Sequence, residues 1–260
     1  MRGFLSGIVE AKRAEVDARM RARPLRRLLG EEAPPARDFA AALASPGISA
    51  IAEIKRRSPS KGVLREDLRV EALAARYAES GARALSILTD REFFGGSDED
   101  LIAARGATEL PVLRKDFTID PYQIHEARRL GADAVLLIVR ILGPGQLREL
   151  SAVAREVGLA AVVEVHTEAE LDRANKAGAA IIGINSRDLD TFETDLSGAM
   201  RLRESIPPDR IAVAESGIRT REDVRRVERQ GFDAMLVGES LLRADEPGSK
   251  LAELLGHDHD

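Results

Sequence analysis

The sequence contains no cysteine, and this absence removes several kinds of chemistry at once. Without cysteine there is no disulfide, no thiolate nucleophile, no iron–sulfur cluster and no cysteine-based zinc site. The chain needs no covalent staple, because 260 residues with 44% hydrophobic content can bury most of their apolar surface in one core. A cysteine-free chain suits a reducing compartment.

Long hydrophobic runs and an excess of positive charge are also missing. No stretch approaches the ~20 consecutive apolar residues of a membrane span. The first residues lack the uninterrupted apolar segment of a signal peptide. The net charge of −5 does not favour binding to nucleic acid or to an anionic membrane. We therefore expect a soluble, cytoplasmic protein that has neither a nucleic-acid nor a membrane partner.

Several well-known catalytic and cofactor motifs do not occur. The chain has no Gly-x-Gly-x-x-Gly fingerprint, no Walker loop, no His-Glu-x-x-His and no Gly-x-Ser-x-Gly. Only His125 and His166, of four histidines, lie within the predicted fold. We interpret the ending Gly-His-Asp-His-Asp as a frayed tail rather than a metal site. The chemistry is therefore expected to depend on lysine, glutamate and backbone amides, with no metal and no cofactor.

What the sequence does contain is a regular alternation of short apolar runs and helical patterns. Because each crossover returns the chain to the same end of the sheet, this alternation predicts parallel strands. The predicted strands are Ser49–Lys55, Arg83–Thr89, Pro111–Lys115, Asp133–Ile138, Ala160–Val165, Ala179–Ile184, Ile211–Glu215 and Asp233–Val237. Leu68–Ser80 and Pro121–Leu130 are examples of the predicted helices between them.

A glycine repeat supports this organisation. Gly81, Gly131, Gly178 and Gly231 each follow a predicted helix and precede a strand, at intervals of 50, 47 and 53 residues. Each interval fits one βαβα unit, with glycine ending the helix in a left-handed conformation. Four units give eight strands, which indicates a closed (β/α)8 barrel, the TIM barrel, over residues 49–255. An open doubly wound sheet is the alternative.

Residues 1–48 precede the first strand and form a predicted helical extension packed on the barrel. The apolar spacing predicts an amphipathic helix over Phe4–Arg23 and a second short helix over Asp38–Ala44. The extension is either a plug for the bottom of the barrel or a lid over its active end. Residues 256–260 are expected to be the frayed tail.

Charged and polar residues gather where the predicted strands end. In a (β/α)8 barrel these carboxyl ends form the active site. Three carboxylates and two lysines around one opening would shift one another's pKa values, as acid–base catalysis requires. A structural network of ion pairs is the alternative. The residues concerned are Glu53, Lys55, Lys115, Glu164, Asn185, Arg187 and Glu215.

Lysine is scarce, with six residues against 33 arginines. A lysine that remains in such a chain can mark a position that needs a titratable amine, because guanidinium does not release its proton. Two glycine-containing turns, at 215–218 and 237–241, follow the last two predicted strands. Loops in these places form the usual phosphate site of this fold. We therefore expect a phosphorylated small molecule as ligand.

Five segments together resemble the indole-3-glycerol-phosphate synthase family of tryptophan biosynthesis. They are Ala-Glu-Ile-Lys-Arg-Arg-Ser-Pro-Ser-Lys-Gly from 52, Leu-Thr-Asp-Arg-Glu-Phe-Phe-Gly-Gly-Ser from 88, Pro-Val-Leu-Arg-Lys-Asp-Phe from 111, Gly-Ile-Asn-Ser-Arg-Asp-Leu from 183 and Ala-Glu-Ser-Gly-Ile from 214. The segments occur in the family's order and spacing, and the N-terminal extension matches too. The resemblance therefore covers nearly the whole chain.

This resemblance implies a lyase that acts without a cofactor. The family closes the ring of 1-(2-carboxyphenylamino)-1-deoxyribulose 5-phosphate, then removes carbon dioxide and water to give indole-3-glycerol phosphate. Lys115 matches the family's general acid, and Glu53 is expected to hold its ammonium in place. Glu164 matches the general base, and Glu215 is expected to orient substrate hydroxyls. Lys55 shares the acid role with Lys115 in a way that the resemblance leaves open.

The resemblance also implies binding residues. Arg187, Lys55 and Asn185 suit substrate anions and hydroxyls. Ser58 lies in a loop, residues 58–62, that is expected to move over the site. The substrate's aromatic ring is expected between Phe94, Phe117, Leu136 and Leu189. The phosphate is expected on Ser216, Gly217, Gly238 and Glu239. Family members often carry serine in place of Glu239, so only its backbone amide carries over.

Three other functions remain open from the residues alone. A class I aldolase-like lyase would form a Schiff base through Lys115 or Lys55. A non-catalytic phosphate-binding or scaffold protein would tolerate substitutions at Lys115 and Glu164. A sugar-phosphate isomerase of histidine or tryptophan synthesis would use an aspartate or cysteine pair that this chain lacks at the corresponding strand ends. We expect a monomer and leave a dimer open.

Overall fold

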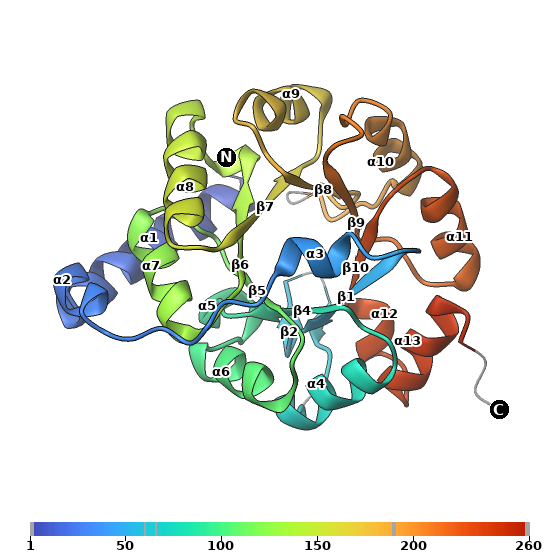
Figure 1. Cartoon of the computed structure of the whole chain (residues 1–260), viewed down its shortest axis with the longest axis horizontal. Helices are drawn as coiled ribbons and strands as arrows, with labels where there is room; N and C mark the ends of the chain where they lie inside the picture. Colours follow the sequence, from blue (N-terminus) through green and yellow to red (C-terminus); the bar gives the residue numbers. More distant parts are fainter. Residues whose placement is uncertain (1–2, 60, 66, 189–190, 258–260) are drawn as a thin grey trace.

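The computed structural model describes residues 3–59, 61–65, 67–188 and 191–257. Eight parallel strands close into a barrel in the order β1-β10-β9-β8-β7-β6-β5-β4 (Figure 1). These strands are β1 (Ser49–Ile54), β4 (Ala84–Leu88), β5 (Val112–Lys115), β6 (Ala134–Ile138), β7 (Ala160–Val165), β8 (Ile181–Asn185), β9 (Ile211–Glu215) and β10 (Ala234–Val237). Each lies within two residues of its predicted bounds, and closure excludes the open doubly wound sheet.

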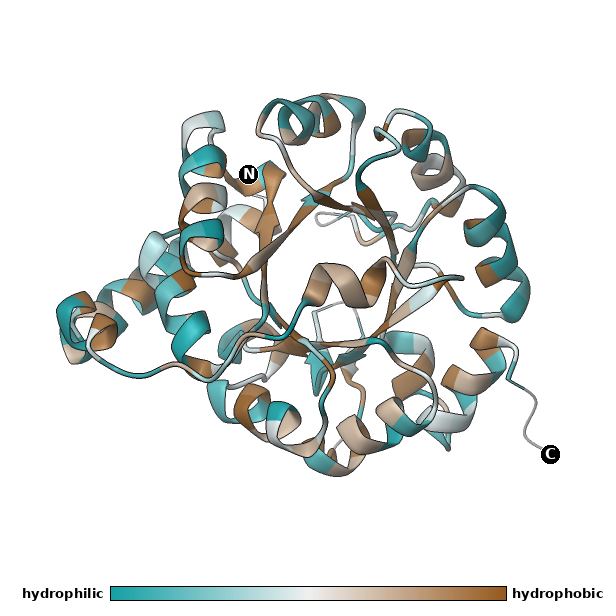
Figure 2. Ribbon diagram, viewed as in Figure 1, coloured by the Kyte–Doolittle hydropathy of each residue, from teal (hydrophilic) through white to brown (hydrophobic). Residues whose placement is uncertain are grey.

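Helices cover the outside of the barrel, so each strand is buried on both faces. One apolar cluster fills the barrel interior, and a larger one lies between strands and helices. Figure 2 shows mainly brown strands inside a ring of helices that mix brown and teal. The ring consists of α4 (Val70–Glu79), α6 (Asp98–Ala107), α7 (Pro121–Leu130), α8 (Pro144–Glu156), α9 (Glu168–Lys176), α10 (Leu196–Arg203), α11 (Arg221–Arg229) and α13 (Pro247–Leu255). Shorter elements are α5 (Arg91–Phe94), η1 (Val139–Ile141) and α12 (Glu239–Leu242).

The predicted glycine repeat is confirmed. Gly81, Gly131, Gly178 and Gly231 have φ angles of 94°, 91°, 74° and 84°. Residues with a Cβ rarely adopt this left-handed conformation, so glycine ends each helix and turns the chain into the next strand. The repeat therefore sets the spacing of the barrel.

The N-terminal extension contributes to both ends of the barrel. It comprises α1 (Phe4–Ala22), α2 (Leu25–Leu29) and α3 (Phe39–Leu43). Figure 1 shows α3 across the barrel opening. Phe39 and Leu43 there join the interior cluster, and the Ser49 hydroxyl at the start of β1 donates to the Leu43 carbonyl at 2.9 Å. Helix α3 is thus a plug for the amino end.

Helix α1 packs at the opposite end. Its Leu5 and Ile8 join the same interior cluster as Phe117, Leu136 and Ile138, which lie at or just beyond the carboxyl ends of their strands. The interpretation as a plug therefore applies to α3, and the interpretation as a lid applies to α1. The division into an extension (1–48) and a barrel (49–255) remains a proposal.

Helix α2 and one hairpin were not predicted. Helix α2 lies between the two helices that we predicted in the extension. The stretch 58–62, expected to be a loop, contributes to an antiparallel hairpin of β2 (Arg57–Ser58) and β3 (Gly62–Val63). Gly62, with a φ of 68°, makes the tight reversal possible.

At the C-terminus, the His257 amide donates to the Ala252 carbonyl at 2.9 Å. The rest of the expected tail, residues 258–260, lies outside the described residues. No helix in the described part of the chain is long and apolar enough to cross a bilayer.

Candidate active site

A cavity of about 530 Å³ opens at the carboxyl ends of the barrel strands. Leu189 lies outside the described residues, so the structure does not place it. The other fifteen site residues proposed from the sequence all line this cavity: Glu53, Lys55, Ser58, Phe94, Lys115, Phe117, Leu136, Glu164, Asn185, Arg187, Glu215, Ser216, Gly217, Gly238 and Glu239.

Strand geometry brings the charged side chains together. Lys115, Asn185 and Glu215 are the last residues of β5, β8 and β9, and Glu164 is the next-to-last residue of β7. Parallel strands that end at one edge of a barrel direct such side chains into a common space. The convergence of these residues, which lie far apart in the sequence, therefore follows directly from the fold.

Lys115 lies at the centre of this group. Its Nζ donates to Glu164 Oε2 at 3.0 Å and lies 3.6 Å from Glu215 Oε2. Burial alone would lower the pKa of Lys115, but the carboxylates of Glu164, Glu215 and Glu53 outweigh it and raise the pKa above its ordinary value. Lys115 is therefore a cation with a proton to donate.

The two carboxylates beside Lys115 have different environments. Burial raises the pKa of both, but for Glu164 the charges of Lys115 and His166 outweigh burial and hold the pKa below its ordinary value. For Glu215, burial and the neighbouring Glu164 carboxylate together raise the pKa, and Lys115 offsets this only in part. Glu164 is thus ionised and Glu215 tends to keep its proton. Such a pair supplies a base and a neutral hydrogen-bond donor in one site.

Glu53 makes a different contact from the one that we expected. Its Oε1 accepts from Lys55 Nζ at 2.5 Å, whereas the direct partners of Lys115 are Glu164 and Glu215. The reason is the strand pattern: Glu53 and Lys55 are two residues apart, so their side chains leave the same face of one strand. Glu53 affects Lys115 through its charge only.

His166 follows β7 and is buried beside the candidate base. Its Nδ1 lies 3.2 Å from Glu170 Oε2, and its Nε2 lies 3.6 Å from Glu164 Oε1. His166 is therefore held by Glu170, whose Oε2 also accepts from the His166 amide at 2.7 Å. The histidine also adds to the field that keeps Glu164 ionised.

The turn after β9 has an unusual backbone. Ser216 and Gly217 have φ angles of 66° and 79°, and positive φ in a serine is a strained conformation. The Ser186 hydroxyl lies 3.0 Å from each of the Glu215 and Ser216 carbonyls. A strained backbone conformation that neighbouring groups keep in place is typical of functional sites.

The turn after β10 is equally constrained. A Cβ on Gly238 would lie 2.6 Å from Glu53 Oε1, so glycine is required for Glu53 to reach its position. The next residue, Glu239, pairs with Arg187 at 2.8 Å and with Arg243 at 3.5 Å. Burial raises the pKa of Glu239, but Arg187 above all outweighs it and lowers the pKa. The side chain of Glu239 is therefore anionic, and a bound phosphate could contact only its backbone amide.

An apolar wall faces these charges. The rings of Phe94 and Phe117 lie with centroids 6.1 Å apart, and Leu136 is buried beside them in the cavity wall. Ser58 is also buried, and its hydroxyl has no hydrogen-bond partner among the described residues. One side of the cavity thus suits a flat aromatic group.

Sequence reasoning missed several residues of the site. Gly183 leaves the space that Glu215 occupies, since a Cβ there would overlap the Glu215 carboxylate. Phe192 lines the cavity and packs on Phe4 of α1 at 5.3 Å. Lys250 also lines the cavity, and its lysine identity in an arginine-rich chain was the available signal. Among the described residues, no group of three or more potential metal ligands is placed to hold an ion.

Solved structures with a similar fold have low sequence identity. 3-Hexulose-6-phosphate synthase from Salmonella typhimurium aligns with a TM-score of 0.64 at 15% identity, covering 81% of this chain and 100% of that one. Thiamine phosphate pyrophosphorylase from Pyrococcus furiosus aligns with a TM-score of 0.61 at 20% identity, covering 80% of this chain and 93% of that one. At this identity the likeness establishes the barrel fold alone.

Sequence relatives are much closer. A protein of Streptomyces coelicolor described as indole-3-glycerol phosphate synthase 2 is 50% identical over 98% of this chain and 100% of its own length. The indole-3-glycerol phosphate synthase of Polaromonas naphthalenivorans is 48% identical over the same shares of the two chains. The family model for indole-3-glycerol phosphate synthase matches residues 5–254. The chain therefore belongs to the indole-3-glycerol phosphate synthase family.

Proposed function

We propose that this chain converts 1-(2-carboxyphenylamino)-1-deoxyribulose 5-phosphate into indole-3-glycerol phosphate, with loss of carbon dioxide and water. The observation that carries the proposal is the position of Lys115 between an ionised Glu164 and a protonated Glu215 in the cavity. A charged acid and an ionised base within 3.0 Å of each other can serve two successive proton transfers on one bound substrate. Family membership supports the same reaction.

Ring closure is the first step. The ring carbon that bears the carboxylate attacks the ketone carbon, and the carbonyl electrons move onto oxygen. Lys115 donates a proton to this oxygen as negative charge develops, so a hydroxyl forms rather than an alkoxide. Its high pKa keeps the ammonium protonated until the transition state needs the proton.

Loss of the carboxylate and of water completes the indole. When the carbon–carbon bond to the carboxylate breaks, its electron pair returns to the ring and restores aromaticity. Dehydration then removes one proton and the new hydroxyl. Glu164 takes the proton, because its lowered pKa keeps it ionised, and an ammonium of the site protonates the leaving hydroxyl. Glu215 orients the substrate hydroxyls.

Binding divides between the two sides of the cavity. Phe94, Phe117 and Leu136 contact the aromatic ring, while the backbone of Ser216–Gly217 and Gly238–Glu239 holds the phosphate. Positive charge for the substrate's anions comes from Lys55 and Arg187, and Asn185 binds hydroxyls. Ser58 contributes its unpartnered hydroxyl from the hairpin.

The Schiff-base lyase is the second candidate, and the charges disfavour it. A lysine attacks a ketone only as the neutral amine, and such lysines normally have lowered pKa values. Lys115 has the opposite shift, because carboxylates surround it. Treating the enzyme–substrate mixture with borohydride should therefore leave the protein mass unchanged, whereas a covalent adduct would support the lyase.

The activity is tested directly by indole fluorescence. Purified enzyme is mixed with the carboxyphenylamino-deoxyribulose phosphate, and Lys115→Met is measured in parallel. We expect fluorescence to rise with the wild type and to collapse in the variant. A folded wild type that gives no signal at any temperature tried would refute the proposal.

We extend the proposal to the state of the enzyme, which we expect to be a cytoplasmic monomer. Sedimentation of the active protein tests this, and activity confined to a larger species would contradict it.

A further inference from the structure

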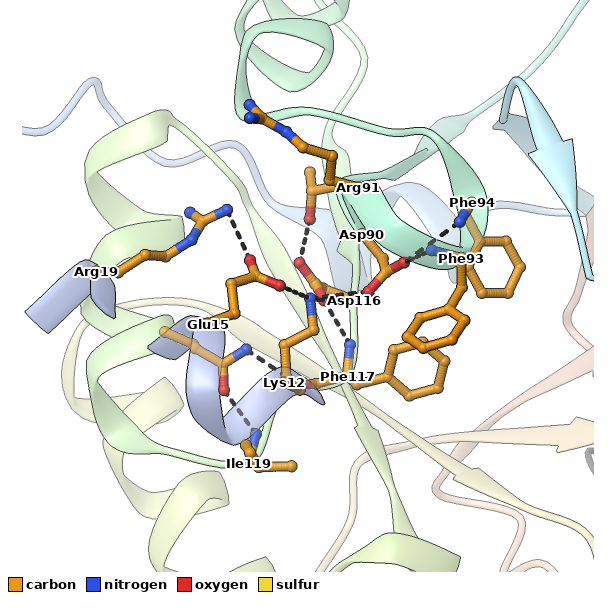
Figure 3. Close-up of polar contacts among 12 residues, drawn as sticks. Lys12, Glu15, Arg19, Asp90, Arg91, Phe93, Phe94, Asp116, Phe117 and Ile119 are labelled. Atoms are coloured by element: carbon orange, nitrogen blue, oxygen red, sulfur yellow. Dashed lines mark hydrogen bonds and ion pairs between the residues drawn. The ribbon is translucent and has the colours of Figure 1, made fainter. Parts of the chain in front are cut away.

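Lys12 of helix α1 has a buried charge that the proposed reaction does not use. Its side chain is only 1% exposed. The ammonium lies 2.7 Å from Glu15 Oε2, 2.9 Å from Asp90 Oδ2 and 2.9 Å from Asp116 Oδ1. Figure 3 shows it between these carboxylates, with the rings of Phe93, Phe94 and Phe117 together on one side. A lysine so deeply buried needs several anionic partners, and Lys12 has them.

Asp90 connects Lys12 to Phe94. We call the space in the cavity beside Phe94 and Phe117 the aromatic slot, and these two rings are its first and second walls. Asp90 directly precedes α5 and caps it: its Oδ1 accepts from the amides of Phe93 at 2.7 Å and Phe94 at 3.3 Å. The other carboxylate oxygen faces Lys12. The position of Asp90 therefore fixes the turn that carries Phe94 into the cavity.

Asp116 connects Lys12 to the second wall in the same way. It lies between Lys115 and Phe117 in the chain, and its Oδ1 accepts from the Phe117 amide at 2.8 Å as well as facing Lys12. Its Oδ2 accepts from the Thr89 hydroxyl at 2.6 Å. Burial raises the pKa of Asp116, but Lys12 and Arg114 outweigh it and lower the pKa to about 2.

One cation thus bridges the two carboxylates that hold the two rings. Arg114 lies 3.8 Å from Asp116 on its other side but has no contact with Asp90 among the described residues. Without the ammonium, two anions would face each other in a place that water hardly reaches, and they would repel. The separation of Phe94 and Phe117 therefore depends on a residue of the N-terminal helix.

We propose that Lys12 is a positioning residue that sets the width of the aromatic slot, and so allows helix α1 to tune the recognition of the substrate's aromatic ring. The proposal rests on the proposed function for the identity of the substrate. Lys12 is not among the described residues that line the cavity. It acts through Asp90 and Asp116 on the two phenylalanines.

The main test compares two variants that separate positioning from folding. Lys12→Met removes the bridge and leaves the aspartates without their shared cation. Lys12→Met with Asp90→Asn restores the charge balance, and the asparagine oxygen can still cap α5. Arg13→Met is the matched control, because Arg13 is an exposed cation on the same helix. Urea unfolding shows how much stability the double variant regains.

The affinities of two small probes, one with an aromatic ring and one without, report directly on the aromatic slot. Calorimetry measures binding of 2-(methylamino)benzoate, which resembles the aromatic part of the substrate, and of inorganic phosphate. In Lys12→Met we expect the aromatic probe to bind about tenfold more weakly, since an aromatic contact contributes up to about that factor. The double variant no longer has two anions facing each other, so it should recover most of this loss. Phosphate affinity should stay within about twofold of the wild type, and Arg13→Met should bind both probes normally.

Steady-state kinetics gives the second readout. With the slot loosened, KM should rise by the same factor while kcat changes less, because Lys115 and Glu164 keep their own contacts. Equal weakening of both probes in Lys12→Met would show that Lys12 only supports the fold. Aromatic binding that stays weak in the double variant, although its stability returns, would show that Lys12 does not act on the slot through the two aspartates. If the wild type binds the aromatic probe but does not turn over the substrate, the proposed function fails while the role of Lys12 is still tested.

Discussion

The two ends of the barrel both bury charge, but they use it differently. At the amino end, Asp133 is fully buried and accepts from the amides of Arg37 at 2.7 Å and Val112 at 2.8 Å, and from the guanidinium of Arg105 at 2.7 Å. These groups tie the extension to the starts of two strands, β5 and β6.

At the carboxyl end the charges face a cavity instead. Lys115 is shared by two carboxylates whose pKa values are shifted in opposite directions, and the adjoining turn contains a serine in a strained conformation. A buried charge that other protein groups satisfy stabilises the fold, whereas charges that face open space remain available to a substrate. Substitutions at the carboxyl end should therefore reduce activity, and substitutions at the amino end should reduce stability.

The largest effect on activity should come from Lys115→Met. Loss of a positioned general acid lowers the rate by about 10²–10⁴-fold, and we expect kcat to fall within this range. The fold should persist, because Glu164 and Glu215 can share a proton when the ammonium is gone. Indole fluorescence gives the rate, and circular dichroism gives the unfolding midpoint. A variant that retains wild-type kcat would remove Lys115 from the reaction.

The opposite result is expected at the amino end, for Asp133→Ala. Removing this carboxylate leaves one buried amide, one half-buried amide and a largely buried guanidinium without their acceptor, so the free energy of unfolding should fall by about 3–5 kcal/mol. Turnover per folded molecule should not change, because no described residue of the cavity lining bonds to Asp133. Urea unfolding and kinetics at a temperature where the variant is folded test both parts. Asp133→Asn should have a milder effect, and a fall in kcat without a loss of stability would contradict the comparison.

Gly183→Ala places a purely steric change at the carboxyl end. The new Cβ would overlap the Glu215 carboxylate, which must then move away from Lys115. Displacing a catalytic group by about 1 Å can cost about 10²-fold in rate. Gly106→Ala in α6 is the control, because a Cβ there meets nothing within 4 Å. Equal kcat in both variants would show that the position of Glu215 is unimportant.

The sequence predicted the strands well because their physical signals are local. Buried parallel strands are continuously apolar, and a left-handed glycine precedes every second strand of the barrel. Charged residues at strand ends, such as Glu164 and Glu215, could also be assigned to one opening, since alternation along a strand determines which face a side chain occupies. The fold class and the members of the site follow from these two rules.

The partners of each charge could not be predicted in this way. Which residues meet across the barrel depends on the stagger between strands, and no single strand contains that information. We therefore predicted that Glu53 would hold the ammonium of Lys115, whereas Glu53 contacts Lys55, two residues along the chain. The contact of Lys12 with Asp90 and Asp116 depends on where α1 docks, which is set by packing over the whole extension. Gly183 gave no signal, because its role is to leave space for Glu215.

The most gradual expected effect is a pH dependence of stability that belongs to the carboxyl end. Burial and Glu164 raise the pKa of Glu215 above its ordinary value of 4.5 in the folded state. In the window between 4.5 and the raised value, the folded protein holds a proton that the unfolded chain has released. The free energy of unfolding should therefore fall as pH rises through this window, by up to about 1.4 kcal/mol per pH unit.

Glu215→Gln isolates this contribution, because glutamine keeps the shape of the protonated acid and does not titrate. Urea unfolding of both proteins between pH 5 and pH 8 gives the difference in stability at each pH, and other groups cancel in that difference. We expect the variant to gain on the wild type steadily as pH rises. A difference that stays constant would mean that Glu215 is already ionised beside Glu164. The two carboxylates would then be equivalent, and the carboxyl end would lose the protonation asymmetry that distinguishes its base from its neutral hydrogen-bond donor.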